Sequence, residues 1–254
     1  VTFNAANAPG VDPVGDVRNI FDDLTNRGDS FTITPTQVTR PGNNFAGVTF
    51  DNLVNEVNLY AGLGADTITA TGLSTANPIN LYATQIYGQS GDDVIDASAE
   101  GGVGVFINGA EGADTITGTQ AGDVIEGGTG NDTIFGEGGA DRIGSFSGDD
   151  TVTGGTGDDI IWLDSTYDEL GNLTSAAQVD HGNDTANWST GDGADDIYGE
   201  SGNDLVNIDL DLGAGVIPVA GLFIDLDGPA SDTNNRDVVD FQVSGAATAT
   251  FEYL

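Results

Sequence analysis

The sequence predicts an all-β protein, a right-handed parallel β-roll or β-helix solenoid with β-rich caps at its ends. Two observations predict this class. A nine-residue pattern of glycine, aspartate and one branched apolar residue recurs along the chain, and apolar residues alternate with polar ones between the recurrences. A short period held in one register is typical of solenoids, and alternation is typical of half-buried strands.

The regular part of the pattern is a run of six consecutive nonapeptides over residues 109–162. They read GAEGADTIT, GTQAGDVIE, GGTGNDTIF, GEGGADRIG, SFSGDDTVT and GGTGDDIIW. The sixth position is Asp in all six copies, and the eighth is Ile or Val. Isolated copies begin at Ala61, Gly88, Thr190 and Gly199, and a weaker copy with Ala186 at its eighth position begins at Val179.

Each part of the nonapeptide has a predicted place in a coil. Glycine at positions one, two and four allows a backbone turn through positive φ, which a Cβ disfavours. Three strand residues follow, and only position eight faces inward because side chains alternate along a strand. Two nonapeptides then close one coil of 18 residues. The predicted core is a narrow column of Ile116, Ile125, Ile134, Ile143, Val152 and Ile161.

The aspartates at position six are predicted to stack in two columns, with Asp114, Asp132 and Asp150 on one side and Asp123, Asp141 and Asp159 on the other. Parallel strands lie about 4.8 Å apart, and calcium–oxygen distances are about 2.3–2.6 Å, so one calcium ion between successive turns reaches both. Magnesium prefers about 2.1 Å and strict octahedral geometry, which fits this gap poorly. The predicted calcium ligands are Asp66, Asp93, Asp114, Asp123, Asp132, Asp141, Asp150, Asp159, Asp184, Asp195 and Asp204.

The alternative for each aspartate is a turn residue that bonds only its own backbone. That alternative does not require a carboxylate every nine residues, so the array favours metal ligands. Asp132 and Asp141 each lie between two neighbours 18 residues away, whereas Asp66 has no neighbour at that spacing. Asp66 is therefore expected to contribute less to stability than Asp132.

The excess of acidic residues excludes some partners and predicts that a cation neutralises the carboxylates. The 254 residues carry 41 Asp and Glu against five Arg and no Lys, a formal net charge of −36. Such a chain repels nucleic acid and anionic membranes. Cysteine is absent, so disulfides and thiolate ligands for zinc are excluded. No apolar run approaches the roughly 18 residues of a membrane-spanning helix, so no membrane insertion is expected.

The repeat resembles the nonapeptide repeat of the RTX family of secreted calcium-binding proteins. The resemblance covers roughly residues 61–207 and rests on the glycines, the Asp at position six and the apolar residue at position eight. It implies a parallel β-roll that holds several calcium ions in its turns. It also implies a secreted, extracellular or cell-surface location.

The rest of the chain is interpreted around that roll. Residues 1–44 are expected to form an N-terminal cap or linker, with a short helix at DVRNIFDDL, and residues 45–207 the roll. An excursion at 163–188 is expected to fold back over the outward-facing Ile160 and Trp162, because large apolar groups need a cover. Residues 208–254 are a C-terminal β cap or an assembly segment, because a solenoid must cover its last edge. Whether the flanks cap their own chain or pair with a neighbouring copy into a filament stays open.

The sequence contains no complete catalytic motif, so the chain is not expected to be an enzyme. RGD at Arg27 is read as a chance match, and GDSF at Gly28 lacks the partners of a serine hydrolase because His181 is the single histidine. Paired carboxylates alone do not exclude a glycosidase, but carboxylates in register are better explained as ligands. An ice-binding rank of threonines is interrupted by Phe135.

The function predicted from these features is an extracellular calcium-binding structural or adhesive module, such as a component of a surface layer, filament or matrix. In the alternative, the chain is a non-catalytic export and folding domain of a larger secreted enzyme or toxin.

Overall fold

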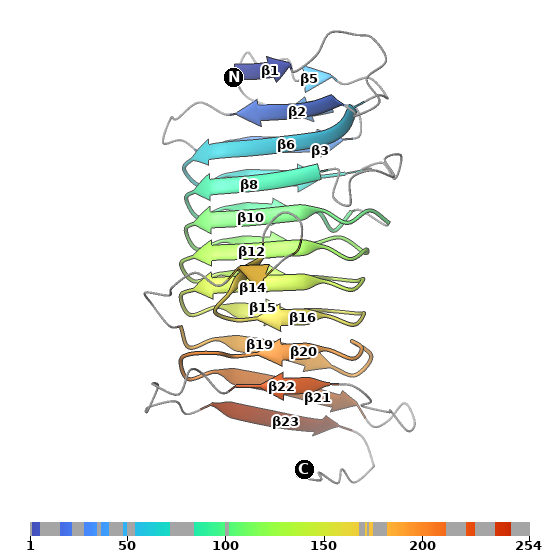
Figure 1. Cartoon of the computed structure of the whole chain (residues 1–254), viewed down its shortest axis with the longest axis vertical. Helices are drawn as coiled ribbons and strands as arrows, with labels where there is room; N and C mark the ends of the chain where they lie inside the picture. Colours follow the sequence, from blue (N-terminus) through green and yellow to red (C-terminus); the bar gives the residue numbers. More distant parts are fainter. Residues whose placement is uncertain are drawn as a thin grey trace.

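The computed structural model is a column of short strands stacked along one long axis, with the N-terminal strands at one end and β23 at the other (Figure 1). It describes residues 2–5, 16–21, 28–34, 37–40, 48–49, 54–71, 84–99, 102–167, 171, 173–174, 182–211, 222–226 and 237–244. No helix occurs among these residues, and so none that is long and apolar enough to cross a membrane. The fold is a parallel β-roll, as the sequence predicts.

Two sheets form opposite walls of the roll. Sheet A contains, in spatial order, β1 (Thr2–Ala5), β2 (Asp16–Phe21), β6 (Val54–Leu63), β8 (Thr84–Ser90), β10 (Phe106–Glu111), β12 (Val124–Thr129), β14 (Arg142–Ser147), β16 (Ile160–Trp162), β20 (Asp196–Tyr198) and β22 (Phe223–Asp225). Sheet B contains β23 (Val238–Ser244), β21 (Leu205–Asp211), β19 (Thr185–Ser189), β15 (Thr151–Thr153), β13 (Thr133–Phe135), β11 (Thr115–Thr117), β9 (Val94–Asp96), β7 (Thr67–Ala70), β3 (Ser30–Thr34), β4 (Gln37–Thr39) and β5 (Val48–Thr49).

The register confirms the predicted coil of two nonapeptides. Ile116 on β11 lies opposite Ile134 on β13, and Ile125 on β12 lies opposite Ile143 on β14. Position eight faces inward throughout the array, and all six predicted core residues are fully buried. In the weak copy that begins at Val179, the small Ala186 takes the inward position. Trp188, two residues later on β19, also faces inward, is 2 % exposed and compensates for the small size of Ala186.

The predicted helix at DVRNIFDDL is wrong. Residues Asp16–Phe21 form strand β2, which pairs in parallel with β6 and places Ile20 opposite Leu59. Both of these residues are buried in the core. Pairing with an existing sheet and burial of Ile20 therefore override any local helical preference, as tertiary context commonly does.

The sheets run through both predicted domain boundaries. Strands β2 and β3 pair in parallel with β6 and β7, and β22 and β23 pair in parallel with β20 and β21. At the N-terminal end the pairing becomes antiparallel, with β1 on β2 and with β4 between β3 and β5. An antiparallel strand changes the edge that the parallel coils would otherwise present.

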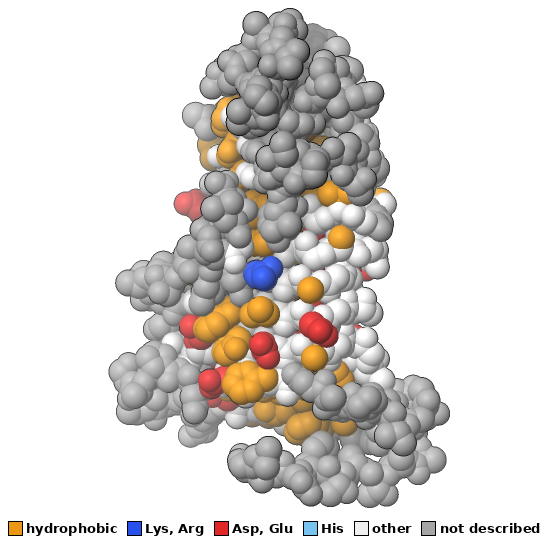
Figure 2. All heavy atoms as spheres, turned by 45° about the vertical axis from the view of Figure 1, so that its right-hand side comes forward, with side chains coloured by type: hydrophobic (Ala, Val, Ile, Leu, Met, Phe, Trp, Pro, Cys, Tyr) orange, Lys and Arg blue, Asp and Glu red, His pale blue; other side chains and the backbone are white. Residues whose placement is uncertain are grey.

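The excursion after β16 does fold back onto the outer face of sheet A. Its strands β17 (Thr166–Tyr167) and β18 (Leu173–Thr174) pair with each other, and β17 packs against β12 and β14. A Cβ placed on Gly171 would lie 3.3 Å from Val124 Cγ2, and Val124 is fully buried. Ile160 and Trp162 belong to the same apolar cluster and are half-buried. Figure 2 shows hydrophobic side chains gathered on one side of the column, with acidic side chains among them.

The glycines of the repeat serve two different purposes. Position four has positive φ, as at Gly130 (121°), and a Cβ there would collide with the carbonyl oxygen of Gly112 in the preceding coil. Position two also has positive φ but tolerates other residues, as at Ala110 and Phe146. Position one does not have positive φ: a Cβ on Gly109 would collide with the carboxylate of Asp114. The predicted reason for the first glycine is therefore wrong, and its purpose is space beside the aspartate.

Gly130→Ala tests the position-four requirement. Positive φ costs an L-residue about 1–2 kcal/mol, and the contact with Gly112 adds to that cost. We expect the melting temperature in calcium to fall by roughly 4–8 °C. The matched control is Gly102→Ala, because no atom lies within 4 Å of a Cβ placed on Gly102. Equal melting temperatures for the two variants would contradict this account of the turn.

Candidate metal centre

The aspartates that enter sheet B form one continuous chain of hydrogen bonds, which we call the B ladder. In each step the backbone N–H of one aspartate donates to Oδ1 of the aspartate one coil further on. Asp114 N–H donates to Asp132 at 2.8 Å, and Asp132 N–H donates to Asp150 at 2.8 Å. The members are Asp29, Asp66, Asp93, Asp114, Asp132, Asp150, Asp184, Asp204 and Asp237.

A second, shorter ladder, the A ladder, enters sheet A on the other side of the roll. Asp123 N–H donates to Asp141 at 2.8 Å, Asp141 N–H to Asp159 at 2.9 Å, and Asp159 N–H to Asp195 at 3.0 Å. The structure thus brings every predicted ligand into one of two columns, and the six aspartates of the regular array lie on the predicted sides. All of the aspartates in the two ladders that were predicted from the sequence are buried, each at most 2 % exposed.

The second carboxylate oxygen of most ladder members lacks a hydrogen-bond donor. This holds for Oδ2 of Asp93, Asp114, Asp132, Asp141, Asp150, Asp159 and Asp184. In the array, the Oδ2 of Asp114, Asp132, Asp141 and Asp159 lies beside the glycine at position one of its own repeat, whereas the repeat of Asp150 begins with Ser145. The carbonyl oxygen of the first residue one coil on borders the same space, as Ser145 O does at Gly127. The first glycine therefore keeps open a small space bordered by oxygen atoms.

Burial raises the pKa of these carboxyls far above the ordinary value of 3.8. The pKa is raised to about 9 for Asp141 and Asp184, to about 8 for Asp150 and to about 7 for Asp132. Desolvation is the largest cause, the backbone N–H bonds oppose it, and neighbouring carboxylates raise the pKa further. The folded chain therefore favours either a proton or another cation beside each carboxylate.

Calcium fits the donor set. Calcium takes six to eight oxygen ligands in flexible geometry, carboxylate and backbone carbonyl alike. Among the described residues, no three His, Cys, Asp or Glu side chains converge to hold a metal by themselves. Backbone carbonyls of the turns, such as Ser145 O beside Gly127, are available as further oxygen ligands. When bound, the ion contributes positive charge that offsets the buried carboxylates.

A family model for the RTX calcium-binding nonapeptide repeat matches residues 84–100, 108–143, 146–170 and 189–207. The repeats of this chain are RTX calcium-binding nonapeptide repeats. RTX repeats bind calcium, so the chain is a calcium-binding protein. Among curated proteins, none matches the chain. Asp66 and Asp184 lie outside the matched stretches, yet both are members of the B ladder.

Asp66 has no neighbour 18 residues away, but the structure places a ladder member on each side of it. Asp66 accepts the N–H of Asp29 at 2.6 Å and donates its own N–H to Asp93 at 2.7 Å. Its neighbours lie 37 and 27 residues away in sequence rather than 18, because insertions lengthen these coils without breaking the ladder. Asp66 therefore stands between two ladder members, as Asp132 does.

Three buried or partly buried aspartates were not predicted from the sequence. Asp29 and Asp237 are the outermost described members of the B ladder. The signal for each was an aspartate two residues before an apolar inward residue, in GDSF and in RDVV, without the usual glycines. Asp164 lies in the excursion, is 1 % exposed and accepts the N–H of Ser201 at 2.7 Å. Its charge contributes to the raised pKa of Asp150 and Asp184.

Asp123, the first aspartate of the A ladder, has a different environment from the others. Its Oδ2 accepts the N–H of Thr119 at 2.6 Å, and its Oδ1 accepts the Thr119 hydroxyl at 3.0 Å and the N–H of Val105 at 2.8 Å. Its repeat has Ala121 instead of glycine at position four. The protein itself therefore supplies donors to both oxygens of this carboxylate.

Asp132→Asn separates a ligand from a turn residue. The amide oxygen keeps the bond from Asp114, but the charge that attracts calcium is lost. We expect the variant to melt about 5 °C or more below the wild type in millimolar calcium, a loss of about 2 kcal/mol. In chelator the order should reverse, because the amide has no buried charge to desolvate. The control is Asp209→Asn, an exposed carboxylate. The same order in calcium and in chelator would contradict a ligand role.

The raised pKa values predict how the ion-free chain responds to pH. Between about pH 4 and pH 9 the folded state holds more protons than the unfolded state, so stability falls as pH rises through this range. Without calcium, we expect β-signal in circular dichroism to be strongest near pH 4 and weakest near pH 9. Adding 0.5 M NaCl screens exposed charges but not buried ones, so the trend should persist in salt. A stability that rises with pH would contradict it.

Proposed function

We propose that the chain is a secreted, non-catalytic module with a structural or adhesive role, whose folding is driven by calcium outside the cell. The observation that carries the proposal is the pair of buried carboxylate ladders with oxygens that lack donors. In a chain with a net charge of −36, burying these carboxylates without a cation has a large free-energy cost. Extracellular modules bind calcium at about 0.1–1 mM, so the fold would form after export, which fits the typical secretion of RTX repeat proteins.

The outer face of sheet A supports the structural and adhesive part of the proposal. Phe21 and Tyr60 stack at 4.6 Å between ring centroids, Tyr60 and Tyr87 at 4.5 Å, and Trp162 and Tyr198 at 4.0 Å. Such ring pairs stabilise strands in register. Tyr60 and Tyr87, with Asn108 and Glu111, border an open groove of about 300 Å³. A rigid surface of aromatic and polar groups is suited to contact with another molecule.

The C-terminal end of the column supports association between copies. Val238 and Phe241 on β23 and Phe223 on β22 are 51 %, 42 % and 48 % exposed. Phe241 lies opposite the buried Ile208, so it continues the inward row of sheet B. We propose that this end adds to the edge of a second copy. A head-to-tail contact does not close on itself, so the product would be a filament or lattice. The export-domain alternative would gain support from a catalytic domain on the same native chain.

A calcium titration of the chelated full chain tests the proposal. We expect native β-signal in circular dichroism to appear only as calcium rises toward about 1 mM. Electron micrographs at that concentration should show elongated end-to-end particles. Val238→Lys should keep the β-signal but prevent association, whereas Val94→Lys, an exposed valine in the middle of sheet B, should not. Native signal in chelator would contradict calcium-driven folding. Particles of one uniform size, the same in both variants, would contradict assembly but would not contradict calcium-driven folding.

A further inference from the structure

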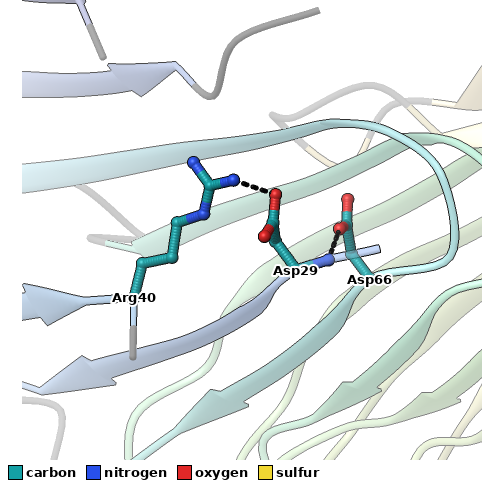
Figure 3. Close-up of polar contacts among 3 residues, drawn as sticks. All are labelled: Asp29, Arg40 and Asp66. Carbon is teal, nitrogen blue, oxygen red and sulfur yellow. Dashed lines mark hydrogen bonds and ion pairs between the residues drawn. The ribbon is translucent and has the colours of Figure 1, made fainter. Parts of the chain in front are cut away.

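The first described member of the B ladder differs from the rest in what its carboxylate contacts. Asp29 donates its N–H to Asp66 Oδ1 at 2.6 Å, as later members do to their neighbours. Its own carboxylate, however, contacts a guanidinium: Arg40 Nη2 donates to Asp29 Oδ2 (Figure 3). At Asp93, Asp114 and Asp132 the corresponding Oδ2 lacks a donor.

The hairpin of β3 and β4 brings Arg40 to this position. In its antiparallel register Thr39 lies opposite Thr32, so Arg40 follows beside Phe31. Arg40 is only 7 % exposed, and its guanidinium carbon lies 5.8 Å from the centre of the Phe31 ring, which belongs to the core. A buried arginine needs an anionic partner, and Asp29 is that partner. The turn at Asp29 thus has a built cation site that already holds a cation.

We propose that Arg40 replaces calcium at the Asp29 turn. Its guanidinium neutralises Asp29 and keeps a divalent ion out, so β3, β4 and the Asp29–Asp66 contact form without calcium. The guanidinium belongs to the chain itself, so this contact does not depend on the calcium concentration. The end of the roll nearest the N-terminus is then a preformed edge, on which the calcium-dependent coils assemble in order.

The inference rests on the proposed binding of calcium by the other ladder members, and it goes beyond that proposal in assigning one turn to an internal cation. With a neutral residue at position 40, calcium should be able to bind at the Asp29 turn. Arg40→Gln should therefore bind one more calcium ion per chain than the wild type. Arg40→Lys keeps the positive charge, so its stoichiometry should equal that of the wild type, as should that of Arg142→Gln, which changes an arginine on the outer face of β14.

Two measurements on the full chain test the proposal. Equilibrium dialysis against calcium gives the stoichiometry of each variant. Hydrogen exchange in chelator should show protected amides in β3 and β4 of the wild type but not in β11 to β15, and Arg40→Gln should lose the protection in β3 and β4. If Arg40→Gln does not fold, the Asp29→Asn, Arg40→Gln double variant should regain wild-type stoichiometry, because neither charge remains.

The outcomes distinguish this inference from the proposed function. Fast exchange of β3 and β4 in wild-type chain without calcium, or equal stoichiometry in Arg40→Gln and Arg40→Lys, would overturn the role of Arg40. Protection of β11 to β15 that calcium does not increase would instead count against calcium-driven folding. Protection confined to β3 and β4 in chelator, with one extra ion in Arg40→Gln, would support both.

Discussion

The structure depends on one repeated interaction, the hydrogen bond from the backbone N–H of an aspartate to the carboxylate of the aspartate one coil on. This bond joins successive turns at the point where the chain enters each strand, as from Asp114 to Asp132. It fixes the register of β11 and β13, and therefore places Ile116 against Ile134 in the core. It also explains the first glycine of the repeat, because the carboxylate occupies the space that a side chain would fill. Turn, strand register and core thus follow from the position of one side chain.

The same interaction buries negative charge, which is the main electrostatic problem of this fold. Desolvation raises the pKa of Asp141 and Asp184 to about 9, so a bare carboxylate is unfavourable at neutral pH. Three kinds of positive charge can offset it: a proton, a calcium ion shared with backbone carbonyls, or a guanidinium. The proton is lost as the pH rises through these raised pKa values, and the calcium ion depends on the ion concentration outside the protein. The third belongs to the chain itself, and Arg40 is the described residue that supplies it.

Much of this could be predicted from the sequence, and the limits have physical causes. The regular array determined the coil length, the core column and the two aspartate columns, because a strict nine-residue spacing leaves one register. Where insertions lengthen a coil, spacing no longer reports adjacency, so the neighbours of Asp66 could not be identified. Asp29 could not be predicted because its segment has no glycine at positions one, two or four; Gly28 is at position five. The strand at Asp16–Phe21 depends on pairing with β6, a contact between distant residues that a local pattern does not reveal.

The two ladders begin in the same way, although with different chemistry. The B ladder starts at Asp29, whose carboxylate receives Arg40, and the A ladder starts at Asp123, whose carboxylate receives three donors from Val105 and Thr119. In both cases the first carboxylate has a partner from the protein, whereas later members such as Asp132 and Asp141 present an oxygen without a donor. A stack of identical turns needs a first turn that does not rely on a preceding one, as terminal repeats of solenoids generally do. The departures from the repeat at Asp29 and at Thr119 are therefore consistent with a single requirement, that each column of buried charge begin on a site completed by the chain itself.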